Sequence, residues 1–129
     1  MTIGGRVRLA LCVLLALIAP HAKAEWVKYG ETDFAIFYLD PDKIQKEDNI
    51  RRVWEFQDLK KRDDSDALSH RFLWEIECNE NMYRERAYSA HSERQLEGTM
   101  LVLRYVMGSA YAIGGGTNLE VIRKRVCAN

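Results

Sequence analysis

The chain has 129 residues, and its 19 Lys and Arg residues are balanced by 19 Asp and Glu residues. A formal net charge of zero argues against nucleic acid as a partner, because proteins that bind nucleic acid usually carry a clustered excess of basic residues. A chain of this length predicts one domain with a hydrophobic core of modest size.

Residues 1–24 have the pattern of a secretory signal peptide. Two arginines precede an apolar run of 11 residues, and a small-residue motif that ends at Ala24 follows. The run is shorter than the roughly 18 to 20 residues that cross a membrane as a helix. Cys12 follows Leu11, whereas a bacterial lipoprotein signal has a small residue there. We therefore expect an exported protein, periplasmic or on the outer surface, with no lipid anchor, no transmembrane segment after cleavage, and a mature domain over residues 25–129.

Two cysteines, Cys78 and Cys127, follow the predicted signal peptide. In an oxidising compartment, a pair of cysteines in a small domain usually forms one disulfide. The bridge would close a loop of about 50 residues, for which the chain-entropy model gives a stabilisation of roughly 4 kcal/mol. Since domains are stable by only about 5 to 15 kcal/mol, this bond could decide whether the domain folds.

The first half of the mature domain predicts four β-strands. Runs of apolar, β-branched and aromatic residues, bounded by turn residues, place them at 26–29, 34–39, 50–59 and 68–78. The polar segment 40–49 is a connection with room for one helical turn near Ile44. The charged segment 60–66 is a flexible connection.

The two long strands have two different faces each. In the strand 50–59, three large apolar residues share one face with Arg52, while Glu55 lies on the other, more polar face. In the strand 68–78, the apolar side chains share a face with Cys78, and we expect this face to point inward.

The register of the hairpin that follows can be argued from charge. A three-residue loop would place Glu75 opposite the like charge of Glu85. A four-residue loop places Glu75 opposite Arg86, and Glu77 opposite Arg84. Facing opposite charges stabilise a sheet by a few tenths of a kcal/mol, and facing like charges destabilise it by a similar amount. We therefore predict the four-residue loop.

In this register Glu85 falls on the apolar face of the sheet. A carboxylate among apolar side chains is costly unless it is paired or hydrated. Glu85 could be a buried acid, a partner of Arg52, or a strand end that water reaches. We expect the last of these.

The segment 99–113 is almost wholly apolar, apart from Arg104 and the Gly-Ser pair at 108 and 109. Its length of 15 residues and the charge near its middle argue against a membrane span. Two strands joined by a turn near Gly108 are predicted. We expect them to lie in the core, with an oligomer interface as the alternative, because the edges of a small sheet need cover.

A helix is predicted from Asn118 to about Cys127. Three glycines end the preceding strands, and a capping box follows, in which Thr117 accepts from the backbone of Glu120 while the Glu120 side chain reaches back. Apolar residues form one stripe along the helix. A helix of about ten residues is marginal on its own, so the disulfide would pin it to the sheet.

Six stretches of the chain form a recognisable series. They are EWVKYGET at 25–32, FYLDPDKIQK at 37–46, NIRRVWEFQDLK at 49–60, WEIECNENMYR at 74–84, AYS at 87–89 and the terminal VC at 126–127. In their order and with the two cysteine positions, they resemble the surface-adhesin protein E-like domain family of Gram-negative bacteria. The resemblance implies an antiparallel β-sheet with a C-terminal helix held by a Cys78–Cys127 bridge, which agrees with the α+β fold of about six strands predicted from the residues. It also implies an adhesin that binds matrix or serum proteins of a host.

Five arginines could form a basic stripe on the sheet. They are Arg51, Arg52, Arg71, Arg84 and Arg86. Such a stripe would recognise an anionic polymer or the acidic surface of a partner. Arg52, Arg84 and Arg86 are the candidate ligand-binding residues, although pairing with glutamates across the sheet would explain Arg84 and Arg86 without a ligand.

The remaining polar residues predict no catalytic, metal-binding or cofactor-binding site. His70 and His91 lie in no motif with a serine and a carboxylate, so we expect ordinary surface residues. The acidic run 63–66 lacks the spacing of a calcium loop, and a solvated turn is expected there.

Together these observations predict an exported, non-enzymatic domain that binds protein through its sheet and needs no cofactor. The partner would be a host matrix or serum protein, or a second copy of the chain in a homodimer. The alternative is a periplasmic structural or envelope-maintenance module without a host ligand.

Overall fold

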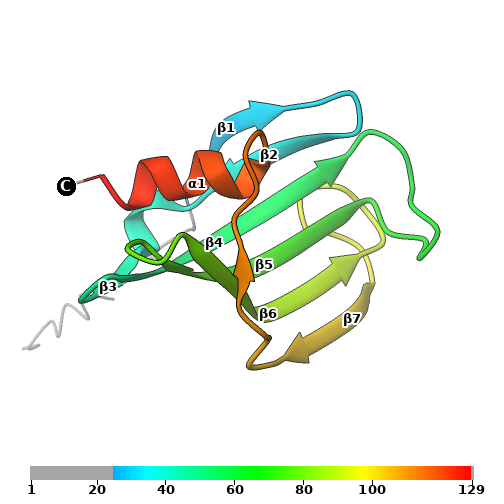
Figure 1. The fold of residues 1–129 in the computed structure, drawn as a ribbon. Coiled ribbons are helices and arrows are strands. Elements are labelled where there is room, and N and C mark those ends of the chain that lie inside the picture. Colours follow the sequence, from blue (N-terminus) through cyan, green and yellow to red (C-terminus); the bar gives the residue numbers. More distant parts are fainter. Residues whose placement is uncertain (1–24, 129) are drawn as a thin grey trace, which may run out of the picture.

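Residues 25–128 are described by a computed structural model, in which the strands form one antiparallel sheet and one α-helix lies across a face of it (Figure 1). The predicted signal peptide, residues 1–24, lies outside the described residues. The predicted α+β fold, an antiparallel sheet with a C-terminal helix, is confirmed.

Six strands form the main path across the sheet, in the order β1-β2-β4-β5-β6-β7. Their bounds are β1 (Val27–Glu31), β2 (Ala35–Leu39), β4 (Ile50–Leu59), β5 (Ser69–Glu77), β6 (Met82–His91) and β7 (Met100–Tyr105). Two short strands lie beside this path: β3 (Gln45–Glu47) pairs with β4, and β8 (Tyr111–Ala112) pairs with β6. A 3-10 turn, η1 (Pro41–Lys43), matches the helical turn predicted near Ile44.

The helix α1 (Asn118–Val126) begins at the predicted capping box. Thr117 Oγ1 accepts the backbone N–H of Glu120 at 3.3 Å. The Glu120 carboxylate reaches back as predicted, but it accepts the N–H of Gly116 at 2.6 Å rather than that of Thr117. In the described part of the chain, no helix is both long and apolar enough to cross a bilayer.

The core lies between α1 and the sheet. Its buried residues are Leu39, Val53, Trp74, Ile76, Ile113, Leu119, Ile122 and Val126. The helix-covered face of β5 is therefore the predicted inward face. In β4 the covered face is the one that carries Val53 and Glu55, whereas Phe56 points to the other side. Phe56 is nevertheless buried, because the rings of Trp26 and Tyr38 pack against it.

Cys78 and Cys127 form the predicted disulfide, which joins the end of β5 to the end of α1. Arg51 Nε donates to the carbonyl of Val126 at 3.1 Å and adds a second link at the same end of the helix. The other end is held by the side chain of Asn118, which donates to a sheet carboxylate at 3.1 Å. Both ends of α1 are thus tied to the sheet.

The predicted register of the β5–β6 hairpin is wrong. Near the turn Glu75 lies opposite Arg84, and beyond a β-bulge at Arg86 Leu73 lies opposite Ala87. Arg84 and Arg86, two residues apart in the strand, point to the same face, and both reach the carboxylate of Glu75. The loop between the paired residues Glu77 and Met82 does have four residues, 78–81, one position earlier than the loop 79–82 of the predicted register. Opposite charges therefore meet across the sheet, but Glu75 faces Arg84 instead of Arg86.

The expectation that the segment 99–113 lies in the core is wrong for most of its length. All six residues of β7 are exposed at the sheet edge farthest from β1 (Figure 1), and Ile113 is the one buried residue of the segment. The strands β7 and β8 do not pair with each other, since each pairs with one end of β6. Gly108 lies between them against β6, where a Cβ atom would come within 2.8 Å of the carbonyl oxygen of Glu85. The apolar side chains of this segment therefore lie mostly on an exposed surface and not in the core.

Replacing Cys78 and Cys127 together by serine should lower the free energy of unfolding by about 2 to 4 kcal/mol, because the unfolded chain regains the freedom that the cross-link removes. Chemical denaturation of the oxidised protein and of the double variant measures the difference. A reducing agent should destabilise the wild type and leave the variant unchanged. Equal stability of the two proteins under oxidising conditions would contradict the tethering role of the bridge.

Candidate functional site

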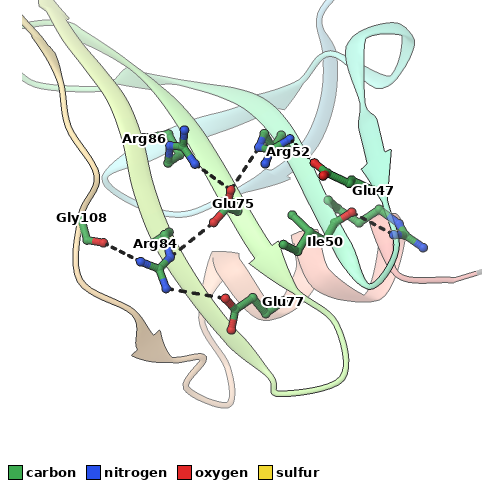
Figure 2. A network of polar contacts seen from close by, with 9 residues as sticks. Glu47, Ile50, Arg52, Glu75, Glu77, Arg84, Arg86 and Gly108 are labelled. Carbon is green, nitrogen blue, oxygen red and sulfur yellow. Dashed lines mark hydrogen bonds and ion pairs between the residues drawn. The ribbon is translucent and has the colours of Figure 1, made fainter.

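The face of the sheet opposite α1 carries a cluster of charged side chains (Figure 2). At its centre, the buried Glu75 carboxylate accepts hydrogen bonds from Arg52 Nε at 3.0 Å and from Arg86 Nη1 at 2.9 Å. Arg84 Nε lies 3.3 Å from the other carboxylate oxygen. The structure thus brings together the three candidate ligand-binding residues, Arg52, Arg84 and Arg86, which we call the arginine cluster.

Two further glutamates balance the arginine cluster. Arg52 Nη1 lies 3.1 Å from a carboxylate oxygen of Glu47, and Arg84 Nη2 lies 3.6 Å from one of Glu77. Hydrogen bonds to Glu47 and to Glu75 raise the pKa of Arg52. Because three carboxylates face the three guanidinium groups, the cluster has no excess positive charge. Ligand binding by these arginines stays a prediction.

The other two arginines of the predicted stripe lie on different faces. Arg51 is on the helix side, where it donates to Val126. Arg71 is on the same face as the arginine cluster, and its guanidinium carbon lies 4.8 Å from the centre of the Trp54 ring. Four of the five arginines therefore share the uncovered face.

An apolar surface borders the arginine cluster on the side of β7. A cavity of about 370 Å³ is lined by Leu73, Arg86, Tyr105, Val106 and Met107. Further exposed apolar residues on β7 are Met100, Leu101, Val102 and Leu103. We call β7 together with Met107 the edge-strand surface. Among residues 25–128, β7 pairs only with β6, so its outer side presents backbone N–H and C=O groups that no described strand pairs with.

A second buried carboxylate, Glu55, lies beneath α1. Its oxygens accept from Gln57 Nε2 at 2.9 Å, Trp74 Nε1 at 3.0 Å, Asn118 Nδ2 at 3.1 Å and the Tyr29 hydroxyl. Burial, followed by the negative charge of Glu55, raises the pKa of Tyr29, so this hydroxyl stays a donor. The four donors come from β1, β4, β5 and α1, and no spacing in the sequence indicates that they meet.

The two histidines are more enclosed than predicted. His91 is buried near the end of β6, where Nε2 lies 2.9 Å from Ser89 Oγ. His70 lies between the Tyr88 hydroxyl at 2.6 Å and the Asp63 carboxylate at 2.7 Å. The prediction that both are ordinary surface residues is therefore wrong.

Asp63 organises the acidic turn. Its carboxylate accepts the backbone N–H groups of Ser65 and Ala67 at 2.9 and 3.0 Å, in addition to its contact with His70. Burial opposes the ionisation of Asp63, but the hydrogen bond that the Ser65 hydroxyl donates at 2.6 Å, together with the contacts above, outweighs it and lowers the pKa of Asp63 to about 2. Across residues 25–128, no group of three His, Cys, Asp or Glu side chains is placed to hold a metal ion.

Glu85 lies beside the bulge rather than at a strand end, and its side chain is 21% exposed. Arg104 Nε lies 3.3 Å from Glu85 Oε2. The alternative in which Glu85 pairs with Arg52 is therefore wrong. Water reaches the pair, because the Arg104 side chain is half exposed.

The chain is similar in sequence to a known protein family and in fold to solved structures. The family model described as surface-adhesin protein E matches residues 26–128. Crystal form II of protein E from Haemophilus influenzae is similar, with a TM-score of 0.59 and 15% identity over 78% of this chain and 95% of that chain. Its selenomethionine form gives a TM-score of 0.61 and 14% identity over 84% and 90%. At such identities the likeness shows a shared fold. None of the curated proteins matches the chain.

Replacing Glu75 by glutamine should lower the free energy of unfolding by about 3 kcal/mol, because it removes the negative charge from a buried, paired carboxylate and leaves three arginines without their common partner. The matched control is Glu77→Gln, in a part-exposed pair, which should cost less than about 1 kcal/mol. Urea denaturation measures both. Equal costs would show that the centre of the cluster has no special role.

The stability of the protein should fall as the pH drops below about 6.5, the value for an unperturbed histidine. Burial, aided by the charges of Arg71 and His70, lowers the pKa of His91, so the unfolded chain takes up a proton more readily than the folded one. The variant His91→Gln should show a flatter stability profile between pH 7 and pH 5. An NMR titration that finds the pKa of His91 at or above 6.5 in the folded protein would contradict this account.

Proposed function

The chain belongs to the surface-adhesin protein E family, and from this we propose that it is an exported, non-enzymatic binding domain that attaches to matrix or serum proteins of a host. The family match carries the host-binding role. The observation that points to contact with another protein chain is the edge-strand surface. It is apolar, exposed along its whole length and open to a further strand.

Sheet edges in soluble proteins are usually protected by charges, prolines or a covering segment. The strand β7 has one charged residue, Arg104, which is engaged with Glu85 and stacks 4.4 Å from the centre of the Tyr88 ring. Its other five residues are Met, Leu, Val, Leu and Tyr. A strand of this composition at an open edge supports strand addition by another protein chain.

A second copy of the chain is the partner that fits this edge best. Two β7 strands that pair antiparallel across a twofold axis form an isologous contact, in which each apolar side chain meets the same surface on the other copy. Such a homodimer joins two sheets into one and leaves both uncovered faces open. The arginine cluster would then contribute contacts to a host protein on that shared face.

The variant Leu103→Lys should shift a dimer to a monomer, because it places a charge in the middle of the proposed contact. Size-exclusion chromatography with light scattering measures the mass. The matched control is Val121→Lys, an exposed apolar residue on α1, which should leave the mass unchanged. A monomeric wild type, or a dimer that tolerates Leu103→Lys, would argue against pairing through β7.

Binding to a panel of immobilised matrix and serum proteins tests the host-ligand role directly. The exported protein should bind at least one of them more strongly than an unrelated periplasmic protein does. Fractionation of intact cells should also find part of the protein at the surface. Signals equal to the control, together with recovery from the periplasmic extract alone, would overturn adhesion in favour of a structural module of the envelope.

A further inference from the structure

A cleft on the uncovered face of the sheet combines aromatic walls with positive charge. It has a volume of about 190 Å³ and is lined by Trp26, Asp40, Lys43, Trp54 and Arg71. Trp26 precedes β1, Asp40 follows β2, and the other three residues belong to η1, β4 and β5. We call it the tryptophan cleft.

Arg71 differs from the arginine cluster in having no carboxylate partner among residues 25–128. Its Nε atom is buried and has no hydrogen-bond acceptor. The guanidinium group stacks on Trp54, which holds it in place at the cleft. The enclosed Nε is out of a ligand's reach, but the Nη groups of Arg71 also have no hydrogen-bond or ion-pair partner among residues 25–128. These donors, held in place by the stacking, remain for a ligand that brings an acceptor into the cleft.

The acidic residue of the cleft, Asp40, is engaged elsewhere. It is buried, its carboxylate accepts the N–H of Asp42 at 3.2 Å, and Lys43 Nζ lies 4.0 Å away. The Lys43 side chain is half exposed, so it can also reach a ligand in the cleft. Two positive charges and one negative charge leave an excess of positive charge next to Arg71.

Two indole rings form the walls. Trp26 packs edge-on against Phe56, with the ring centres 4.8 Å apart, and Trp54 supports Arg71. Flat aromatic faces accept the apolar face of a sugar ring, and a guanidinium group forms paired hydrogen bonds with a carboxylate or a sulfate. The cleft is smaller than the roughly 300 to 1,000 Å³ of pockets for drug-sized ligands, so it suits one ring of a longer chain.

We propose that the tryptophan cleft binds one acidic sugar residue of a polysaccharide, whose carboxylate or sulfate pairs with Arg71 and Lys43 while its ring lies against Trp26 and Trp54. This site is separate from the protein contacts proposed above. Two sources offer the same chemistry: sulfated glycosaminoglycans of a host matrix and acidic core sugars of the bacterial outer leaflet.

Calorimetric titration of the exported protein with three probes tests the site: a heparin hexasaccharide, the acidic core oligosaccharide of lipopolysaccharide, and neutral maltohexaose. At least one acidic probe should bind and the neutral one should not. Binding of heparin alone assigns the site to the host matrix, and binding of the core alone assigns it to the envelope. Failure of both acidic probes to bind, or equal binding of maltohexaose, overturns the proposal.

Arg71→Gln should weaken binding of the acidic probe by about tenfold or more, since it removes a charge-assisted contact. The matched control is Arg125→Gln, which removes an exposed arginine of α1, on the opposite side of the sheet from the cleft. It should change the affinity by less than about twofold, as expected for an exposed charge away from the ligand. Equal losses in the two variants would show general charge attraction and would overturn a specific site.

The three tryptophans provide a further readout by NMR. The indole N–H signals of Trp26 and Trp54 should shift when the acidic probe binds, whereas that of Trp74, which lies under α1, should not. An unchanged Trp74 signal in Arg71→Gln also shows that the variant is folded. Binding without shifts of Trp26 and Trp54 would place the ligand elsewhere and overturn the proposal.

Discussion

The disulfide between Cys78 and Cys127 holds a nine-residue helix against one face of the sheet, at the end where β5 finishes. A helix of this length is not stable alone, and its three buried side chains complete the core only while it stays in place. The helix covers the face that carries the apolar side chains of β5 and Cys78, so the other face of the sheet remains uncovered. The arginine cluster and the tryptophan cleft are exposed there because the disulfide and the core together keep the helix on the opposite side.

The two faces of the sheet stabilise buried carboxylates in different ways. On the helix side, Glu55 is surrounded by neutral donors, one of which, Asn118, belongs to the first turn of α1. On the uncovered side, Glu75 is surrounded by three arginines that water also reaches. A buried charge is tolerated when hydrogen bonds satisfy it. Because the donors come from different elements, each of the two carboxylates ties several elements together. Glu55 connects helix to sheet, while Glu75 orients the arginines of the binding face.

Local signals were enough to predict the helix and the main strands, because a capping residue and period-two alternation each act within one element. The disulfide could be predicted because two cysteines after the signal peptide allow one pairing. The bulge at Arg86 could not be predicted, since pair energies of a few tenths of a kcal/mol do not choose between registers once an extra residue is allowed. Composition could not tell that β7 is an exposed edge, because core strands and interface strands are equally apolar. The site at Glu55 depends on four elements that meet only in the folded chain.

The order of the strands separates the two proposed contacts. The tryptophan cleft lies over β4 and β5, while the edge-strand surface lies at β7, with β6 between them. A dimer through β7 therefore leaves both clefts free, on one continuous sheet and at a fixed separation. A polysaccharide long enough to span that separation would engage the second cleft at a high effective concentration after binding the first. In this arrangement the open edge sets the spacing of the clefts, so dimerisation would raise the avidity for a repeating ligand without altering either site.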